Sequence, residues 1–184
     1  MPTNNNLEEA IFANGCFWCT EAVFQQLNGV EKVISGYTGG TVENPTYEEV
    51  CNKKTGHAEA LQITYDPNKI TYDELLEVFW KTHDPTSMDR QGNDVGPQYR
   101  SIIFYNNEEQ KEKAIAYKKE LDASGAFDAP IVTFIQPLTI FYPAESMHSN
   151  YYQNHPTQPY CYFVIKPKLD KLKKVFADKL KSNL

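Results

Sequence analysis

The segment Gly15-Cys16-Phe17-Trp18-Cys19 constrains this chain most, because it joins an apolar strand to a helix. An apolar run at residues 10–13 precedes it, and helix-forming residues 21–27 follow it. This order places Cys16 at or just before the first helical turn, where free backbone N–H groups and the helix dipole favour an anion. We therefore expect the Cys16 thiol to ionise readily and to act as a nucleophile.

The neighbours of Cys16 are suited to a binding slot. Gly15 lets the backbone turn sharply and leaves room for a substrate to approach. Phe17 and Trp18 could form the wall of an apolar slot beside the thiol. The alternative is that both rings are core residues and the cysteines are inert. We favour the reactive interpretation, because a strand–helix junction seldom needs two thiols so close together.

Composition limits the classes of protein to consider. With 184 residues, 41% hydrophobic and 23% charged, the chain has the make-up of one ordinary globular domain. Its net charge of −6 gives no electrostatic support for a nucleic-acid partner. The N-terminus MPTNNNLEEA lacks the features of a signal peptide, and no apolar run approaches the ~20 residues of a membrane span. We expect a cytoplasmic protein without membrane association, in which free thiols persist.

The order of expected elements indicates an α+β fold, a two-layer sandwich with helices over a mixed sheet. Its β-α-β-β-α-β core is ferredoxin-like. Strands are expected near residues 9–13, 30–37, 58–65, 101–105 and 131–136, and helices near 17–27, from 71, near 108–124 and from 167. We expect a single catalytic domain over residues 1–184, with a flexible N-terminus at 1–6 and an irregular wrap and terminal helix at 142–184.

Several local signals support these boundaries. Thr71-Tyr72-Asp73-Glu74 fits a capping box at a helix start. Two long polar loops, at residues 36–47 and 84–98, are of a kind that usually serves a site. The terminal helix begins at Pro167 and is expected to present one apolar face. That face consists of Leu169, Leu172, Val175, Phe176 and Leu180.

Glu59 is a candidate acid, because it begins a strand whose later members are apolar. A buried carboxyl group retains its proton near neutral pH and can donate it. From position alone, however, an exposed edge glutamate is favoured. Tyr47 and Tyr99 lie in the polar loops, and packing is favoured for both on the same ground. His57 is interpreted as a polar histidine satisfied at the strand start.

The pair Cys16-x-x-Cys19 fits either a redox dithiol or half of a zinc site. Zinc would need two further ligands, and the sequence contains no second CxxC and no HxxxH. We therefore expect no metal, and a zinc-binding interaction module is the weaker alternative. The remaining histidines are interpreted as surface or capping residues: His83, His148 and His155.

Six blocks of the sequence occur in a characteristic order. They are Gly15-Cys16-Phe17-Trp18, Gly36-Tyr37-Thr38-Gly39-Gly40, Asn44-Pro45-Thr46-Tyr47, Gly56-His57-Ala58-Glu59-Ala60, His83-Asp84-Pro85 and residues 91–101. Together they closely resemble the type A peptide methionine sulfoxide reductases, over about residues 9–165. The resemblance implies reduction of the S-epimer of methionine sulfoxide, protein-bound or free, with no cofactor. It also implies recycling of the oxidised enzyme by thioredoxin or a similar dithiol.

The resemblance implies a role for each candidate. Cys16 matches the nucleophile, which becomes a sulfenic acid, and Glu59 matches the general acid. Tyr47 and Tyr99 match hydroxyl groups that bind the sulfoxide oxygen. Asp94 matches an acidic residue that helps to shape the site.

Phe17 and Trp18 match the wall that holds the S-methyl group of the substrate. A chiral sulfoxide presents methyl, oxygen and lone pair in a fixed handedness. If aromatic rings take the methyl group and hydroxyl donors take the oxygen, only one epimer offers its sulfur to Cys16.

The chain departs from the family pattern at Cys19, where many members have glycine. Those members use a resolving cysteine in the C-terminal region, and Cys161 stands at that position here. Both thiols could form the disulfide with Cys16, and we favour Cys19 because a CxxC pair at a helix start closes readily. Cys51 is expected to be a buried structural thiol.

A thioredoxin-like disulfide oxidoreductase is the main rival class, since strand, CxxC and helix occur there as well. In that class the tryptophan precedes the cysteine pair, and the Glu59 and Asp94 blocks have no role. The expected oligomeric state is a monomer.

Overall fold

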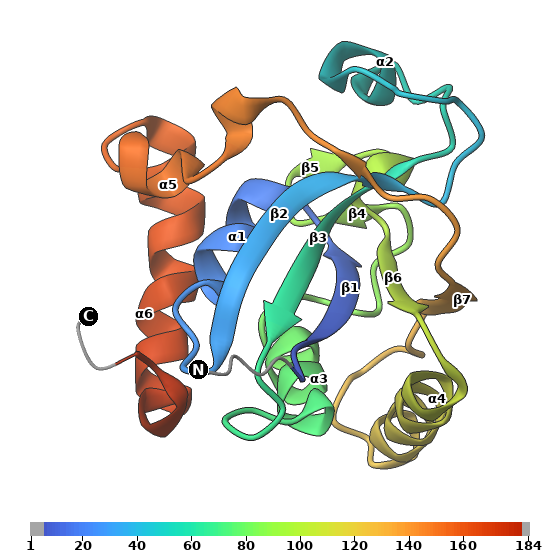
Figure 1. The fold of residues 1–184 in the computed structure, drawn as a ribbon, viewed down its shortest axis with the longest axis vertical. Helices are drawn as coiled ribbons and strands as arrows, with labels where there is room; N and C mark the ends of the chain where they lie inside the picture. Colours follow the sequence, from blue (N-terminus) through green and yellow to red (C-terminus); the bar gives the residue numbers. More distant parts are fainter. Residues whose placement is uncertain (1–5, 182–184) are drawn as a thin grey trace.

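The computed structural model describes residues 6–181, and its main feature is one six-stranded sheet (Figure 1). The strand order is β7-β6-β1-β3-β2-β8. These strands are β1 (Glu8–Asn14), β2 (Val30–Thr38), β3 (Ala58–Tyr65), β6 (Ser101–Tyr105), β7 (Phe134–Pro137) and β8 (Tyr142–Pro143). The expectation of a flexible N-terminus falls on residues 1–6, of which 1–5 lie outside the described residues.

The helices are mostly short and lie between or after these strands. They are α1 (Phe17–Phe24), α2 (Tyr47–Cys51), α3 (Tyr72–Lys81), α4 (Glu108–Ala123), α5 (Tyr151–Asn154) and α6 (Lys166–Val175). A π-helical turn, Cys161–Ile165, leads directly into α6. Single 3₁₀ turns occupy Pro97–Tyr99, Ser146–His148 and Ala177–Lys179, and a small hairpin pairs β4 (Arg90–Gln91) with β5 (Asp94–Val95).

The ferredoxin-like core is confirmed by the strand pairing. Strand β3 lies between β1 and β2 and runs antiparallel to both, and β1 also pairs antiparallel with β6. The order β6-β1-β3-β2 is that of two interleaved β-α-β units. Strand β7 adds to β6 in parallel and makes the sheet mixed.

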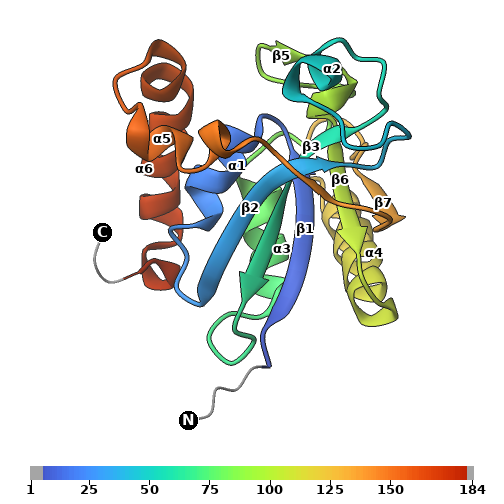
Figure 2. The same cartoon turned by 45° about the horizontal axis from the view of Figure 1, so that its top comes forward.

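The two faces of the sheet are covered differently. Helices α1, α3 and α6 pack on one face over the main apolar core, which includes Phe12, Leu61 and Phe79. The other face is covered by the chain between β7 and β8, which crosses the strands in Figure 2. Gly36 permits this crossing, because a Cβ there would lie 2.5 Å from the ring of Phe141.

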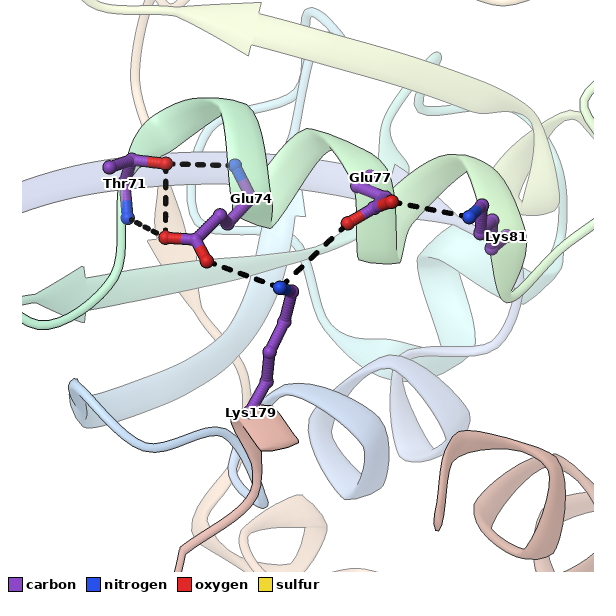
Figure 3. Close-up of polar contacts among 5 residues, drawn as sticks. All are labelled: Thr71, Glu74, Glu77, Lys81 and Lys179. Carbon is purple, nitrogen blue, oxygen red and sulfur yellow. Dashed lines mark hydrogen bonds and ion pairs between the residues drawn. The ribbon is translucent and has the colours of Figure 1, made fainter. Parts of the chain in front are cut away.

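The chain after α6 is fastened to α3 by Lys179 (Figure 3). Thr71 and Glu74 form the predicted capping box, and Glu74 Oε2 also accepts from Lys179 Nζ at 3.2 Å. Glu77 lies 4.0 Å from the same ammonium group and pairs with Lys81 at 3.2 Å. Such partly exposed pairs contribute about 0–1 kcal/mol each, so they orient the segment more than they stabilise it.

Helix α1 ends at Phe24, three residues before the expected limit of 27. Leu27 instead forms a bridge with Leu180, and the flanking backbone groups bond to the same C-terminal segment. Tertiary pairing therefore removes residues 26–28 from the helix. Of the apolar face expected after Pro167, Leu169, Leu172 and Phe176 are buried, whereas Val175, the last residue of α6, is exposed.

Two further boundaries differ from expectation. Strand β7 begins at Phe134 and not near residue 131, since the N–H of Val132 bonds to Pro85 O, away from β6. Helix α2 begins at Tyr47, the last residue of the loop expected at 36–47, after a capping box between Thr46 and Glu49. Among residues 6–181, no helix has both the length and the apolar character to cross a bilayer.

Candidate active site

Cys16 is the N-cap residue of α1, as the sequence predicts. Gly15 has φ +114°, and a Cβ there would lie 2.9 Å from the Gln91 side chain, so the turn requires glycine. The turn is secured from its other end, since Thr20 Oγ1 donates to Asn14 Oδ1 at 2.7 Å. The carbonyl of Cys16 accepts from the N–H of Cys19 at 3.0 Å. These bonds hold both thiols at the first turn of the helix.

Glu59 reaches the same turn from strand β3. It is 1% exposed, so the interpretation as an exposed edge glutamate is wrong. Its Oε1 accepts from the N–H of Phe17 at 3.0 Å, while Oε2 is buried with no partner among the described residues. Burial raises the pKa of this carboxyl group to about 8, even though the Phe17 N–H opposes the shift. Glu59 therefore retains its proton at neutral pH.

The two thiols behave differently from the sequence expectation. Burial is the first of several causes that raise the pKa of Cys16 well above its ordinary value, so the expected ready ionisation is wrong for the resting protein. The helix terminus does not compensate for the lost hydration. A hydrogen bond with Cys16 lowers the pKa of Cys19 to about 7, and the charge of Lys168 acts in the same direction. The pair shares this bond, and ionisation of one thiol disfavours ionisation of the other.

Tyr47 and Tyr99 lie near Glu59, each on a short helical segment. Tyr47 is the first residue of α2, and Tyr99 ends the turn Pro97–Tyr99. Burial, and next the charge of Glu59, raise the pKa of both phenols. Both hydroxyl groups therefore stay protonated and can donate hydrogen bonds beside the carboxyl group.

Asp94 lies beside the thiols, on the β4–β5 hairpin. Its Oδ2 accepts from the hydroxyl of Tyr160 at 2.5 Å, and that hydroxyl lies 3.5 Å from Cys19 Sγ. A cavity of about 280 Å³ opens here, lined by both thiols, Asp94, Tyr160 and Lys168 among others. The structure thus brings Asp94 to the thiol pair, through a tyrosine that the sequence analysis did not single out.

Phe17 and Trp18 differ in exposure and contacts. Phe17 is fully buried, and its ring centroid lies 5.6 Å from that of Tyr37. Trp18 is half-buried and stacks on Tyr151, with 3.8 Å between centroids and 4° between planes. Trp18 also contacts Tyr47, with 6.4 Å between centroids. The indole is therefore the accessible part of the aromatic wall.

Residues of the segment 142–160 complete this wall, and sequence reasoning missed their roles. His148 is buried and accepts from Trp18 Nε1 at 3.0 Å, so its interpretation as a surface or capping residue is wrong. Glu145 accepts from the Tyr37 hydroxyl and from the Tyr47 backbone N–H, each at 2.9 Å. The one sequence signal for these residues was the spacing of Glu145 and His148, three residues apart, among tyrosines in a segment without periodicity.

The other histidines have structural positions. His57 Nδ1 accepts from the N–H of Gly40 at 3.0 Å, which confirms a satisfied polar histidine. His83 contacts Phe79 O at the end of α3 and is buried, so it is a capping residue and not a surface one. His155 is exposed and contacts Tyr151 O at the end of α5. No three histidine, cysteine or acidic side chains gather as metal ligands within residues 6–181.

The two remaining cysteines are placed differently. Cys161 is buried in the same apolar cluster as Cys16 and Cys19, at the start of the π-helical turn. Cys51 is half-buried at the end of α2, less enclosed than expected. All four thiols are free. Cys19 and Cys161 are therefore both free to pair with Cys16, and neither forms a disulfide with it.

Comparisons with known proteins identify the family of the chain. The family model described as peptide methionine sulfoxide reductase matches residues 8–180. A peptide methionine sulfoxide reductase MsrA of Deinococcus radiodurans is 56% identical over 174 residues, covering 95% of this chain and 84% of that protein.

Two solved structures of a yeast protein share the fold. Reduced Mxr1 of Saccharomyces cerevisiae superposes with a TM-score of 0.79 at 32% identity, over 85% of this chain and 91% of Mxr1. Mxr1 in complex with Trx2 superposes with a TM-score of 0.56 at 25% identity, over 82% and 90%. The chain therefore belongs to the peptide methionine sulfoxide reductase family and is an enzyme of that oxidoreductase class.

Proposed function

We propose that this enzyme reduces the S-epimer of methionine sulfoxide, protein-bound or free, with Cys16 as nucleophile and Glu59 as general acid. The observation that carries the proposal is the first turn of α1, where the thiol and a protonated, buried carboxyl group meet. Sulfoxide oxygen leaves poorly unless it is protonated, so attack by sulfur needs an acid close to that oxygen.

In the first step the Cys16 sulfur attacks the sulfoxide sulfur as Glu59 gives its proton to the oxygen. This attack forms a sulfur–sulfur bond and leaves the protonated oxygen as a hydroxyl group on the substrate sulfur. Transfer of that hydroxyl group to the Cys16 sulfur breaks the substrate's sulfur–oxygen bond and the new sulfur–sulfur bond, so methionine is released and Cys16 becomes a sulfenic acid. Cys16 must lose its own proton during this step, because burial keeps the thiol protonated at rest. The ionised Glu59 left behind is the nearby group that regains a proton.

The hydroxyl groups of Tyr47 and Tyr99 hold the sulfoxide oxygen and stabilise its developing charge. Both stay protonated beside Glu59, as this role requires. The half-buried indole of Trp18 receives the S-methyl group, and the buried ring of Phe17 completes the wall of that pocket. With methyl and oxygen fixed on different sides, one epimer presents its sulfur to Cys16. Asp94 shapes the site beside the thiols through Tyr160.

In the second step a resolving thiol attacks the sulfenic acid, a disulfide forms and water leaves. We propose Cys19 for this step, because it lies on the same helical turn as Cys16 and its pKa is lowered, whereas burial raises the pKa of Cys161. Cys161 is the alternative. An external dithiol then reduces the disulfide by exchange and is itself oxidised. The complex of yeast Mxr1 with Trx2 supports thioredoxin as that reductant.

The same proposal includes a single catalytic domain over residues 1–184, acting as a monomer. Every group used above comes from one chain. The proposed location is the cytoplasm, where a reduced dithiol pool is available for recycling.

Separated S and R diastereomers of a peptide methionine sulfoxide test the proposal. With a dithiol reductant, we expect the wild-type protein to consume the S form alone. The Cys16→Ser variant should lose activity, whereas Cys51→Ser, which changes a thiol outside the mechanism, should retain it. Equal consumption of both diastereomers, or activity in Cys16→Ser, would contradict the proposal.

A further inference from the structure

Arg100 connects the 3₁₀ turn that ends at Tyr99 to the chain that leads to Glu59. Its Nη1 donates to Pro97 O, in that turn, at 2.8 Å, and its Nη2 donates to Gly56 O at 2.9 Å. Gly56 precedes Glu59 by three residues, just before strand β3 begins. A guanidinium group is planar and rigid, so the two carbonyl oxygens that it binds are held in a fixed relation. One side chain thus joins the backbone around the phenol to the backbone before the acid.

The Gly56 end of this connection is also fixed by other contacts. The N–H of Thr41 donates to Thr55 O at 3.0 Å. The N–H of Gly40 donates to His57 Nδ1, also at 3.0 Å. The two segments cross so closely that a Cβ on Gly40 would lie 2.3 Å from the backbone nitrogen of His57. Gly56 is therefore a firm reference point for any group that bonds to it.

The Tyr99 end depends more on this connection. Tyr99 ends a single 3₁₀ turn after a long polar loop, and its N–H donates to Gly96 O at 3.0 Å. No hydrogen bond among residues 6–181 holds its hydroxyl group, so the backbone of the turn sets the position of the phenol. Strand β6 begins only at Ser101. The guanidinium of Arg100 therefore ties this turn to the start of strand β3.

Ion pairing does not account for the burial of this guanidinium. Arg100 is half-buried, and it forms no ion pair within the described residues 6–181. Burial lowers the pKa of Arg100, and the charge of Asp89 opposes the shift only in part. Burying a cation costs free energy unless hydrogen bonds offset the loss of water. The two backbone carbonyl groups supply those bonds, so Arg100 serves as a connection between two backbone segments.

We propose that Arg100 is a positioning residue: it holds the Tyr99 hydroxyl and the Glu59 carboxyl group in alignment, so that both meet the same sulfoxide oxygen. The inference rests on the proposed function, which assigns that oxygen to both groups. A displacement of about 1 Å can cost ~10²-fold in rate. Negative charge on the oxygen is larger in the transition state than in the bound substrate, so lost alignment should lower kcat more than it raises KM.

The two arginines of the chain offer a matched comparison, because Arg90 also bonds a backbone carbonyl, that of Gly92, at 2.8 Å within its own hairpin. With the S diastereomer of a peptide methionine sulfoxide, we expect Arg100→Met to lower kcat about 10–100-fold, with KM within about threefold. Arg90→Met should keep kcat within about twofold of wild type, because its bond is local. Arg100→Lys keeps the charge without the fork that bridges two carbonyls, so its kcat should stay at least about fivefold below wild type.

A double-mutant cycle identifies the group through which Arg100 acts. Tyr99→Phe removes the hydroxyl group that the guanidinium is proposed to align. In that background, Arg100→Met should change kcat by less than about twofold, because a ring without a donor loses nothing further when it is displaced. In a Tyr47→Phe background the full effect of Arg100→Met should persist, since Tyr47 stands on α2, away from the connection. A merely structural role would lower kcat by the same factor in every background.

Reduction of the enzyme disulfide by a small dithiol is the second measurement, because this step does not use Tyr99. We expect Arg100→Met to be reduced at the wild-type rate. An equal slowing of disulfide reduction and of kcat would overturn the inference, as would a wild-type kcat in Arg100→Met or equal effects of that substitution with and without the Tyr99 hydroxyl. Failure of the proposed function has a different signature, since the wild-type protein itself would then leave the S diastereomer unreduced.

Discussion

The backbone N–H of Phe17 donates to Glu59 Oε1 at 3.0 Å, which joins the first turn of α1 to strand β3. The bond directs the carboxyl group to the turn that carries Cys16. Only one oxygen is used, and Oε2 has no partner among residues 6–181. The same carboxyl group is thus fixed in place and left with an oxygen that can carry a transferable proton.

Removal of the acid should slow the reaction without preventing folding. We expect Glu59→Gln to lower kcat by about 10²–10⁴-fold, the usual contribution of a positioned acid. The wild-type rate should fall as pH rises through about 8, because the donor is the protonated form. Steady-state assays across pH test both statements. Glu77→Gln, on α3, is the control. If the fall in rate at high pH persists in Glu59→Gln, Glu59 is not the acid.

The free energy of unfolding should also depend on pH because of Glu59. The pKa of Glu59 is higher folded than unfolded, so the folded state binds more protons between about pH 4.5 and 8. Stability that is present below this range is lost as pH rises through it, by on the order of a few kcal/mol. In denaturant unfolding, the free energy of unfolding of Glu59→Gln should therefore rise relative to that of the wild type from pH 5 to pH 8. An equal difference in unfolding free energy between variant and wild type at both pH values would contradict a raised pKa of Glu59.

The resolving thiol should be identifiable after one turnover. We expect Cys19→Ser to accumulate the Cys16 sulfenic acid, because Cys19 lies on the same first helical turn as Cys16, whereas Cys161 lies on the separate π-helical turn. Cys161→Ser should form the Cys16–Cys19 disulfide at the wild-type rate. Mass spectrometry with a sulfenic-acid trap distinguishes these products, with Cys51→Ser as control. Accumulation in Cys161→Ser instead would assign resolution to Cys161.

Tyr160 should help to lower the pKa of the Cys19 thiol. Its hydroxyl lies 3.5 Å from Cys19 Sγ, and this contact is among the causes that lower the pKa of Cys19. We therefore expect Tyr160→Phe to raise that pKa, as followed by the ultraviolet absorbance of the thiolate. Tyr162→Phe is a matched control, since Tyr162 is exposed on the same turn. If the two variants titrate alike, Tyr160 has no part in the ionisation of Cys19.

Local signals predicted those elements that depend on neighbouring residues alone. Strand β3 has the expected bounds, because the alternation of Leu61, Ile63 and Tyr65 is stopped by Asp66-Pro67. The capping box of Thr71 was also predictable, since both of its bonds lie within four residues. Helix α1, by contrast, ends early because residues 26–28 pair with a segment about 150 positions away.

The sequence by itself determined the core topology, the turn at Gly15 and the position of Cys16 at a helix start, because each depends on periodicity or local backbone geometry. Only the tertiary structure decided the ionisation of Cys16 and Glu59, since burial depends on packing from the whole chain. It also decided the hydrogen-bond partner of the Trp18 indole. Trp18 and His148 are 130 residues apart, in a segment with no repeating pattern, and only the folded chain brings them together.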